Sequence, residues 1–317
     1  MGTLLVSDML TTVWLLLWVS LLWWLGRRWL SMIRRFMMNH GMLRPNYKGQ
    51  IIATGCGLLI WLLVLVNTMM MNGLASFFRG QKELTAFNQV SFLSYTAAMS
   101  VVALAGFADD AIGDKMIKGL KGHWLLWKEK QICSTGLLKA ILTGIAALLF
   151  VSGLSSDSWW QLCADLILLG LMTNGINLLD VRPGRALKGF FMITAAGTFV
   201  QLSAIAISGQ FHIGELLQTA MKLAPYVLPV YIGAGILLGP DLRAELMIGD
   251  AGANVLGFAL GCWVVLGSAW QLQAILIVLL LVLHIMAWRS SVSQWIEANR
   301  LLLWFDLLGR SKEKASR

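Results

Sequence analysis

The stretch AGFADDAIGDKMIKGLKGH, from Ala105 to His123, decides how the rest of this sequence is interpreted. An apolar segment that begins at about Val90 ends here at two adjacent carboxylates, Asp109 and Asp110, and lysines and glycines follow them. Carboxylates at the end of a membrane span are costly to keep away from water, so they are candidates for a functional site. Acids beside lysines and glycines favour a site for a cation and a phosphate group.

The composition indicates a membrane protein with many spans. Hydrophobic residues make up 58% of the 317 residues and charged residues 13%, whereas a soluble domain carries roughly 25% charged residues. The net charge of +9 would suggest a nucleic-acid partner in a soluble chain. In a membrane protein, however, basic residues mark the cytoplasmic loops. We therefore expect no nucleic-acid partner and an all-α fold, a polytopic helical bundle of about nine transmembrane helices, with ten as the alternative.

The apolar segments place the expected spans. They are Leu4–Leu25, Ile51–Met71, Gln89–Ala108, Gly136–Gly153, Trp159–Ile176, Gly189–Ile207, Ala224–Leu238, Ala251–Leu266 and Gln271–Trp288. If the loop after the first span is cytoplasmic, all but three of the 25 Lys and Arg residues fall on that side. This bias predicts an N-terminus outside the cell and a cytoplasmic C-terminus.

The chain is expected to divide into a transmembrane domain, 1–288, with the catalytic loops on its cytoplasmic side, and a charged cytoplasmic tail, 289–317. The apolar stretch Leu301–Leu308 of the tail is too short to cross a membrane. We expect it to form an amphipathic helix at the inner leaflet, with Trp295, Trp304 and Phe305 inserted.

Two further polar motifs fall on the same expected side as the acidic pair. One is NGINLLD, in which Asn174, Asn177 and Asp180 follow one another at intervals of three, and the other contains Asp250 after Gly249. If the span helix continues far enough, the three NGINLLD side chains line one face. Carboxylate and amide oxygens are ligands that suit Mg²⁺, which is therefore the expected cofactor.

Other polar residues near these motifs are candidates for binding the substrate. Lys118 and Lys121 would neutralise a diphosphate as point charges. His123 either touches a phosphate or lies in a polar loop, and Asn46 either lines the same pocket or only precedes the second span. Each of the three motifs also has a simpler interpretation on its own: a solvated span boundary, a helix cap and a turn.

At these motifs the chain resembles the polyprenyl-phosphate N-acetylhexosamine-1-phosphate transferase superfamily. This superfamily includes phospho-N-acetylmuramoyl-pentapeptide transferase and the UDP-N-acetylglucosamine:undecaprenyl-phosphate transferases. GFADD resembles the acidic pair of the family, NGINLLD its N-x-x-N-x-x-D segment and LMIGDAGAN its F-M-G-D-x-G-S segment. The order and spacing match over roughly residues 45–257.

The resemblance implies an Mg²⁺-dependent transfer of a sugar-1-phosphate from a UDP-sugar to a polyprenyl phosphate, with release of UMP. It implies a plasma-membrane enzyme of cell-envelope glycan synthesis, with a cytoplasmic active site and a homodimer as a family-level expectation. By analogy Asp109 is the base, Asp110 lies in the same charged cluster and Asp180 lies close to the metal ligands, so these three acids are the expected catalytic residues. Asn177 and Asp250 are the metal ligands, and Lys121 is a diphosphate contact.

The chain also departs from the family pattern, and the departures describe a divergent subfamily. After Asp180, Pro183 replaces a second acid, and Arg182 and Arg185 enter as candidate substrate contacts. The late histidine cluster of many relatives is absent from the sequence. These departures motivate one alternative, a degenerate lipid-binding scaffold. A transporter for an anionic solute is the other, although transporters place polar sites nearer the membrane midplane.

Overall fold

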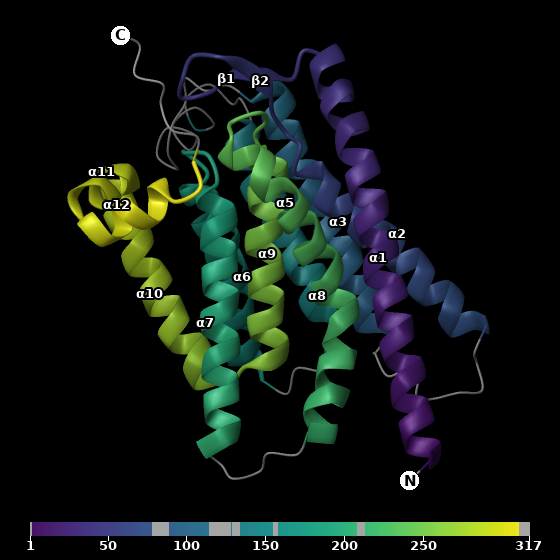
Figure 1. The fold of residues 1–317 in the computed structure, drawn as a ribbon. Coiled ribbons are helices and arrows are strands. Elements are labelled where there is room, and N and C mark those ends of the chain that lie inside the picture. The colour runs from purple at the N-terminus through teal and green to yellow at the C-terminus, as the bar shows by residue number, and fades with distance from the viewer. Residues whose placement is uncertain are drawn as a thin grey trace.

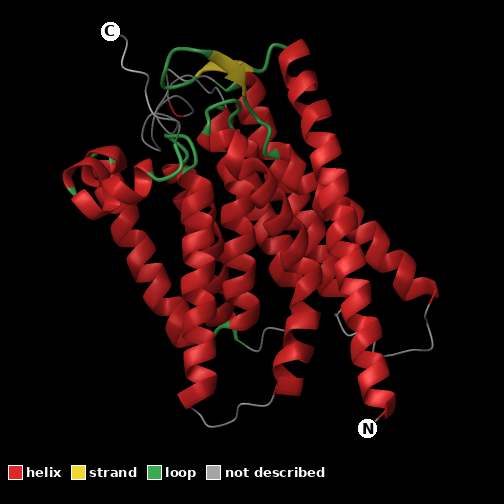
Figure 2. Ribbon diagram, viewed as in Figure 1, coloured by secondary structure: helices red, strands yellow, loops and turns green. Residues whose placement is uncertain are grey.

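The computed structural model describes residues 2–77, 89–113, 128, 134–154, 158–207 and 213–310. Long helices dominate the fold, and two short strands lie at one end of the bundle (Figures 1 and 2). The elements are α1 (Gly2–Asn39), β1 (Leu43–Pro45), β2 (Ile51–Ala53), α2 (Leu58–Phe77), α3 (Gln89–Ile112), α5 (Thr135–Ser152), α6 (Trp159–Leu179), α7 (Arg185–Ile207), α8 (Ile213–Leu242), α9 (Gly249–Gly267), α10 (Trp270–Arg289), α11 (Val292–Ala298) and α12 (Arg300–Leu307).

Each of the nine expected spans overlaps one long helix. Among the described residues, six of these helices are long and apolar enough to cross a membrane: α3, α5, α6, the second part of α8, α9 and α10. The chain is therefore a helical membrane protein. For α1, α2 and α7, and for the orientation in the membrane, the spans stay a prediction.

The second span begins later than the sequence suggested, because Ile51–Ala53 is a strand and α2 starts only at Leu58. β1 and β2 form an antiparallel hairpin in which Leu43 lies opposite Ala53. The amide of Met247 donates to the Ala53 carbonyl at 2.8 Å, and the amide of Cys56 donates to the Met247 carbonyl at 3.1 Å. These bonds tie the segment before α2 to the segment before α9.

Helix α9 lies at the centre of the bundle, between α6 and α3 (Figure 1). All of its residues from Ala251 to Cys262 are buried, and many are glycine or alanine. Small side chains let membrane helices approach closely where apolar burial alone does not drive association. By contrast, most side chains of α10 are exposed, as expected for a helix at the edge of the bundle that faces lipid.

The tail after α10 folds into two short helices that pack against the bundle. The predicted boundary at 289 coincides with the end of α10, and the described part of the tail ends at Arg310. Trp304 is exposed, as the sequence suggested, but Trp295 and Phe305 are partly buried. The Lys188 ammonium lies over the ring of Phe305, 5.3 Å from the ring centroid, so Phe305 packs against α7. The insertion of the tail into a membrane stays a prediction.

Candidate functional site

Two carboxylates from different helices share one cation. Asp109 lies near the end of α3 and Asp250 in the first turn of α9, and the Lys139 ammonium, near the start of α5, contacts both. The Lys139 Nζ atom lies 2.9 Å from Asp109 Oδ2 and also binds Asp250 Oδ2. All three side chains are only partly exposed, so the attraction between them is screened less than on a surface.

Asp110 caps the N-terminus of α9. Its Oδ2 atom accepts a hydrogen bond from the Ala251 amide at 3.0 Å, and the side chain is buried. A carboxylate in this position satisfies an amide that the helix leaves unpaired and is favoured by the helix dipole. The Arg44 Nη2 atom donates to the backbone carbonyl of Asp110 at 2.9 Å. Asp110 therefore fixes where α9 begins relative to α3.

Two glycines bring α3 and α9 close enough for the acids to meet. A Cβ atom on Gly106 would lie 2.5 Å from the Asp250 carbonyl oxygen, inside van der Waals contact with backbone. Gly249 has a φ of 67°, a conformation that suits glycine because other residues carry a Cβ that clashes there. A Cβ atom at Gly249 would also lie 2.4 Å from Asp110 Oδ2.

Asp180 and Asp241 extend the acidic cluster. Asp180 follows the last residue of α6, and its amide donates to the Asn177 carbonyl at 3.1 Å. The pKa of Asp180 is raised well above its usual value, first by burial and then by the negative charges of Asp241, Asp250 and Asp110. Asp241, at the end of α8, is itself buried. Five carboxylates from four helices thus gather at one end of the bundle.

The residues of this cluster suit Mg²⁺ in charge and in ligand type. Hard carboxylate oxygens are present, and the Lys139 ammonium already occupies a cation position between two carboxylates. Within the described residues, no group of three or more His, Cys, Asp or Glu side chains is arranged to hold a metal ion. A metal held by Asp109, Asp250 and Asn177 would therefore require Lys139 to give way.

The structure brings together some of the candidate residues from the sequence and not others. Asp109, Asp110, Asp180 and Asp250 belong to one cluster, as described above. Asn177 is partly buried near the end of α6, whereas Asn174 is exposed one turn earlier. Lys118, Lys121 and His123 lie outside the described residues.

Three substrate-binding candidates have other partners. Asn46 is buried, and its Oδ1 atom accepts from the amides of Lys48 and Gln50 at 2.9 and 3.0 Å. It therefore holds the turn between β1 and β2. Arg185 is also buried, and its guanidinium pairs with a tail carboxylate described below. Arg182 pairs with the exposed Glu297 at 3.6 Å.

The sequence analysis missed Lys139 and Asp241 as members of the site. Lys139 is the sole charged residue between Thr135 and Ser152, and a charge inside a span is a functional candidate by default. In the sequence, Lys139 counted only among the basic residues that orient the spans, although its position inside a span already marked it as a candidate. Asp241 lies in the sequence GPDLR, which is typical of an ordinary loop. Comparison of the chain with models of protein families and with curated proteins finds no match.

Proposed function

We propose that this protein is a phosphoglycosyltransferase. It transfers a sugar-1-phosphate, in our proposal N-acetylhexosamine-1-phosphate, from a UDP-sugar to polyprenyl phosphate in the plasma membrane. The products are a lipid-diphosphate sugar and UMP, and the pathway is synthesis of a cell-envelope glycan on the cytoplasmic side. The observation that carries this proposal is the convergence of Asp109 and Asp250 on one cation at an end of the bundle.

The chemistry of the transfer suits such a cluster. An oxygen of the lipid phosphate attacks the phosphorus that bears the sugar. The bond from that phosphorus to the oxygen bridging the two phosphates then breaks, and UMP leaves with the electron pair. Phosphoryl transfer needs little covalent help from the protein, and positioning and neutralisation of charge dominate. Asp109 would take the proton of the lipid phosphate where that phosphate arrives protonated.

The residues around the Lys139 bridge have distinct tasks in this proposal. Asp110 holds the start of α9, so that Asp250 faces Asp109 across a fixed gap. Asp109, Asp250 and Asn177 would hold Mg²⁺, which when bound neutralises charge on the diphosphate. Lys139 favours the ionised form of both carboxylates and adds positive charge where a diphosphate must be neutralised.

A direct assay tests the proposal. Purified protein in lipid nanodiscs is incubated with Mg²⁺, undecaprenyl phosphate and radiolabelled UDP-N-acetylhexosamines. We expect label in the lipid fraction together with UMP. Asp109→Asn and Asp250→Asn should slow the transfer by about 100-fold or more, the scale of a lost acid–base or charge-stabilising group. Asp165→Asn is the matched control because Asp165 is a buried acid near the opposite end of α6.

The outcomes of this assay separate the alternatives. Transfer that is equally fast in Asp250→Asn would remove the basis of the proposal. Lack of turnover with every UDP-sugar tested would favour a second function, a lipid-binding scaffold. The Lys139 bridge favours that alternative, because the ammonium joins Asp109 and Asp250 without a metal. A scaffold would bind polyprenyl phosphate with the same affinity in Mg²⁺ and in EDTA.

A further inference from the structure

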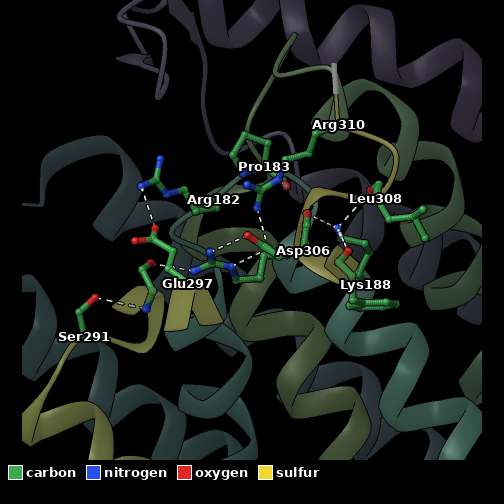
Figure 3. A network of polar contacts seen from close by, with 11 residues as sticks. Arg182, Pro183, Lys188, Ser291, Glu297, Asp306, Leu308 and Arg310 are labelled. Atoms are coloured by element: carbon green, nitrogen blue, oxygen red, sulfur yellow. Dashed lines mark hydrogen bonds and ion pairs between the residues drawn. The ribbon is translucent and has the colours of Figure 1, made fainter. Parts of the chain in front are cut away.

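The tail hairpin, α11 and α12 with Leu308–Arg310, docks onto the turn that joins α6 to α7. This turn runs from Asp180 to Gly184, and Asp180 belongs to the acidic cluster. Figure 3 shows the polar contacts between the hairpin and the turn. The two segments lie more than 100 residues apart in the sequence, and the contacts between them involve side chains that are mostly buried.

Asp306 is the centre of these contacts. Its carboxylate is 5% exposed, and Arg185 donates to both of its oxygens, from Nε and from Nη2, each at 2.9 Å. The Nη2 atom of Arg310 donates to Asp306 Oδ1 at 2.7 Å. Bidentate pairing between a guanidinium and a carboxylate combines a strong charge-assisted bond with a fixed geometry. Asp306 therefore fixes the first residue of α7 to α12.

Lys188 adds a second connection, one turn further along α7. Its ammonium donates to the backbone carbonyls of Phe305 and Leu308 at 2.8 and 3.2 Å, and also to that of Asp306. These carbonyls lie at the C-terminal end of α12, where helix carbonyls lack partners within the helix and carry partial negative charge. A lysine here satisfies them and secures the end of the hairpin.

The turn itself is held on both sides. On one side, the Nε atom of Arg310 donates to the Pro183 carbonyl at 3.0 Å. On the other, the Gly184 amide donates to Asp241 Oδ2 at 2.7 Å. Side-chain atoms of Leu242 lie against both Gly184 and Gly309. The turn is thus enclosed between the end of α8, which carries Asp241 of the acidic cluster, and the hairpin.

We propose that the tail hairpin positions Asp180 in the acidic cluster, with Asp306 as the positioning residue. The hairpin touches neither substrate nor metal in this account, and it acts through Arg185 and the turn. Removing one partner of a buried ion pair leaves an uncompensated charge, whereas removing both is far less costly. The consequence for turnover rests on the proposed function, but the placement of the turn does not.

Hydrogen exchange measured by mass spectrometry on the full chain in nanodiscs tests the placement without any substrate. We expect Asp306→Asn to speed exchange of the amides in 181–188 by about tenfold or more, because local opening exposes them. Peptides from α5 and α9 should be unchanged. Glu297→Gln is the matched control, because Glu297 lies on the same hairpin in an exposed pair, and it should change exchange by less than about twofold.

Two further variants keep the test decisive. The double variant of Arg185→Gln and Asp306→Asn lacks both charges of the pair. Its amides in 181–188 should therefore exchange more slowly than those of Asp306→Asn alone. If Asp306→Asn does not fold, Arg310→Gln keeps the Arg185 pair but loses the bond to Pro183, and it should speed exchange by a smaller factor. Unchanged exchange in 181–188 in whichever single variant folds would overturn the proposal.

Transferase kinetics then separate positioning from general destabilisation. For Asp306→Asn we expect kcat to fall about tenfold while KM for the UDP-sugar stays within about threefold, because binding groups outside the turn are intact. Asp306→Glu, which keeps the charge, should recover part of kcat. A loss of binding with unchanged kcat would contradict a positioning role. If the wild-type protein has no turnover, the proposed function fails, and the exchange experiment still decides the positioning.

A second inference rests on a different observation, the outer face of the hairpin. Leu301 and Trp304 are 78% and 64% exposed, and their spacing of three residues places them on one face of α12. Leu308, which directly follows α12, is 50% exposed. Trp288, at the end of α10, is 79% exposed. Only Ser290 and Ser291 separate α10 from α11, so the hairpin begins within about 10 Å of the end of the span.

We infer that this face lies in the bilayer surface at that end of α10, because the hairpin begins two residues after a helix whose side chains are mostly exposed. Aromatic and leucine side chains on such helices insert at the headgroup boundary. The test attaches an environment-sensitive fluorophore at Trp304→Cys or at Glu297→Cys, with Cys133 and Cys163 replaced by serine, since Cys56 and Cys262 are buried. We expect a blue-shifted signal, quenched by spin-labelled lipid, at 304 only. A signal at 304 that is quenched by iodide and not by the lipid would overturn this inference.

Discussion

The protein contains two clusters of ion pairs at the same end of the bundle, and they differ in how completely their charges are satisfied. In the tail cluster, Asp306 accepts three hydrogen bonds from two arginines, and Lys188 is bound by three carbonyls. In the acidic cluster, the carboxylates outnumber the cations: among the described residues only Lys139 forms ion pairs with them.

This difference supports our proposal that the tail cluster holds the fold and that the acidic cluster binds a ligand. A buried polar network whose members are all satisfied makes its surroundings rigid. A group of buried carboxylates with too little positive charge carries an electrostatic cost that a bound cation removes. The tail cluster is therefore structural, although the sequence suggested Arg185 as a substrate contact. The acidic cluster is the place where a cation and a diphosphate would lower the free energy.

The two clusters should differ most in how much transfer activity is lost when one of their carboxylates is replaced. Asp250→Asn should reduce transfer by about 100-fold or more, whereas Asp306→Asn should reduce it about tenfold through the position of Asp180. Both rates are measured on labelled lipid product under saturating substrate. Equal losses in the two variants would mean that the two clusters do not have separate roles.

The second largest expected effect is a loss of protein stability when the close contact between α3 and α9 is disturbed. Gly249→Ala forces a side chain into a left-handed backbone conformation and against Asp110. We expect it to destabilise the protein by about 1–3 kcal/mol, measured as a lower midpoint of thermal unfolding in detergent. Gly144→Ala is the control, because nothing lies within 4 Å of a Cβ there and alanine is favoured within a helix. A midpoint for Gly249→Ala at or above that of the wild type would contradict the close contact.

Lys139 competes with a metal for the same carboxylates in this account. Lys139→Gln should therefore tighten binding of a divalent cation by about tenfold, equivalent to about 1.4 kcal/mol, while it lowers turnover. Isothermal titration with Mg²⁺ checks the affinity, and Lys139→Arg, which keeps the charge, is the control. Weaker metal binding in Lys139→Gln would show that the lysine supports the metal rather than competing with it.

The pH dependence of the tail follows from Asp306. Burial alone would raise the pKa of Asp306, but the hydrogen bonds and charge of Arg185, followed by the charges of Arg310 and Lys188, hold it below its ordinary value. The pair therefore contributes stability above the unfolded pKa of about 3.9, and this contribution is lost as the pH falls through the folded pKa. Hydrogen exchange in α12 should be constant, after correction for intrinsic rates, from pH 7 to about pH 5. Above pH 7 the contact of Lys188 with α12 weakens, because burial lowers the pKa of Lys188 to about 8.

Asp306→Asn provides the control for this pH dependence. Its exchange in α12 should already be fast at neutral pH and should gain no further acid sensitivity from residue 306. Loss of protection in the wild type as the pH falls from 7 to 6 would contradict the role of the Arg185 pair.

The smallest effect belongs to the exposed pair of Arg182 and Glu297, which are separated by 3.6 Å. Exposed ion pairs contribute about 0.2–1 kcal/mol and are weakened by salt. Glu297→Gln should therefore shift the thermal midpoint by no more than about 2 °C in low salt and not at all in high salt. A shift as large as that of Asp306→Asn would mean that the hairpin is held mainly by its surface.

The sequence predicted the long helices and much of the acidic cluster, but not the contacts between distant segments. Apolar length is visible locally, so α3 was placed at Gln89–Ala108 and extends to Ile112. The pairing of Arg185 with Asp306 spans 121 residues, and no local pattern encodes it. Phe305 was expected in lipid, but it packs on Lys188 because the hairpin turns back onto α7.

The central claim is that Asp109 and Asp250 hold one divalent cation together. The most direct measurement is Mn²⁺ binding to the purified protein, followed by electron paramagnetic resonance of the free ion. The account predicts one tightly bound Mn²⁺ per chain, displaced by Mg²⁺, lost in both Asp109→Asn and Asp250→Asn and retained in Asp306→Asn. Binding that survives in either of the first two variants, or no binding in the wild-type protein, would contradict it.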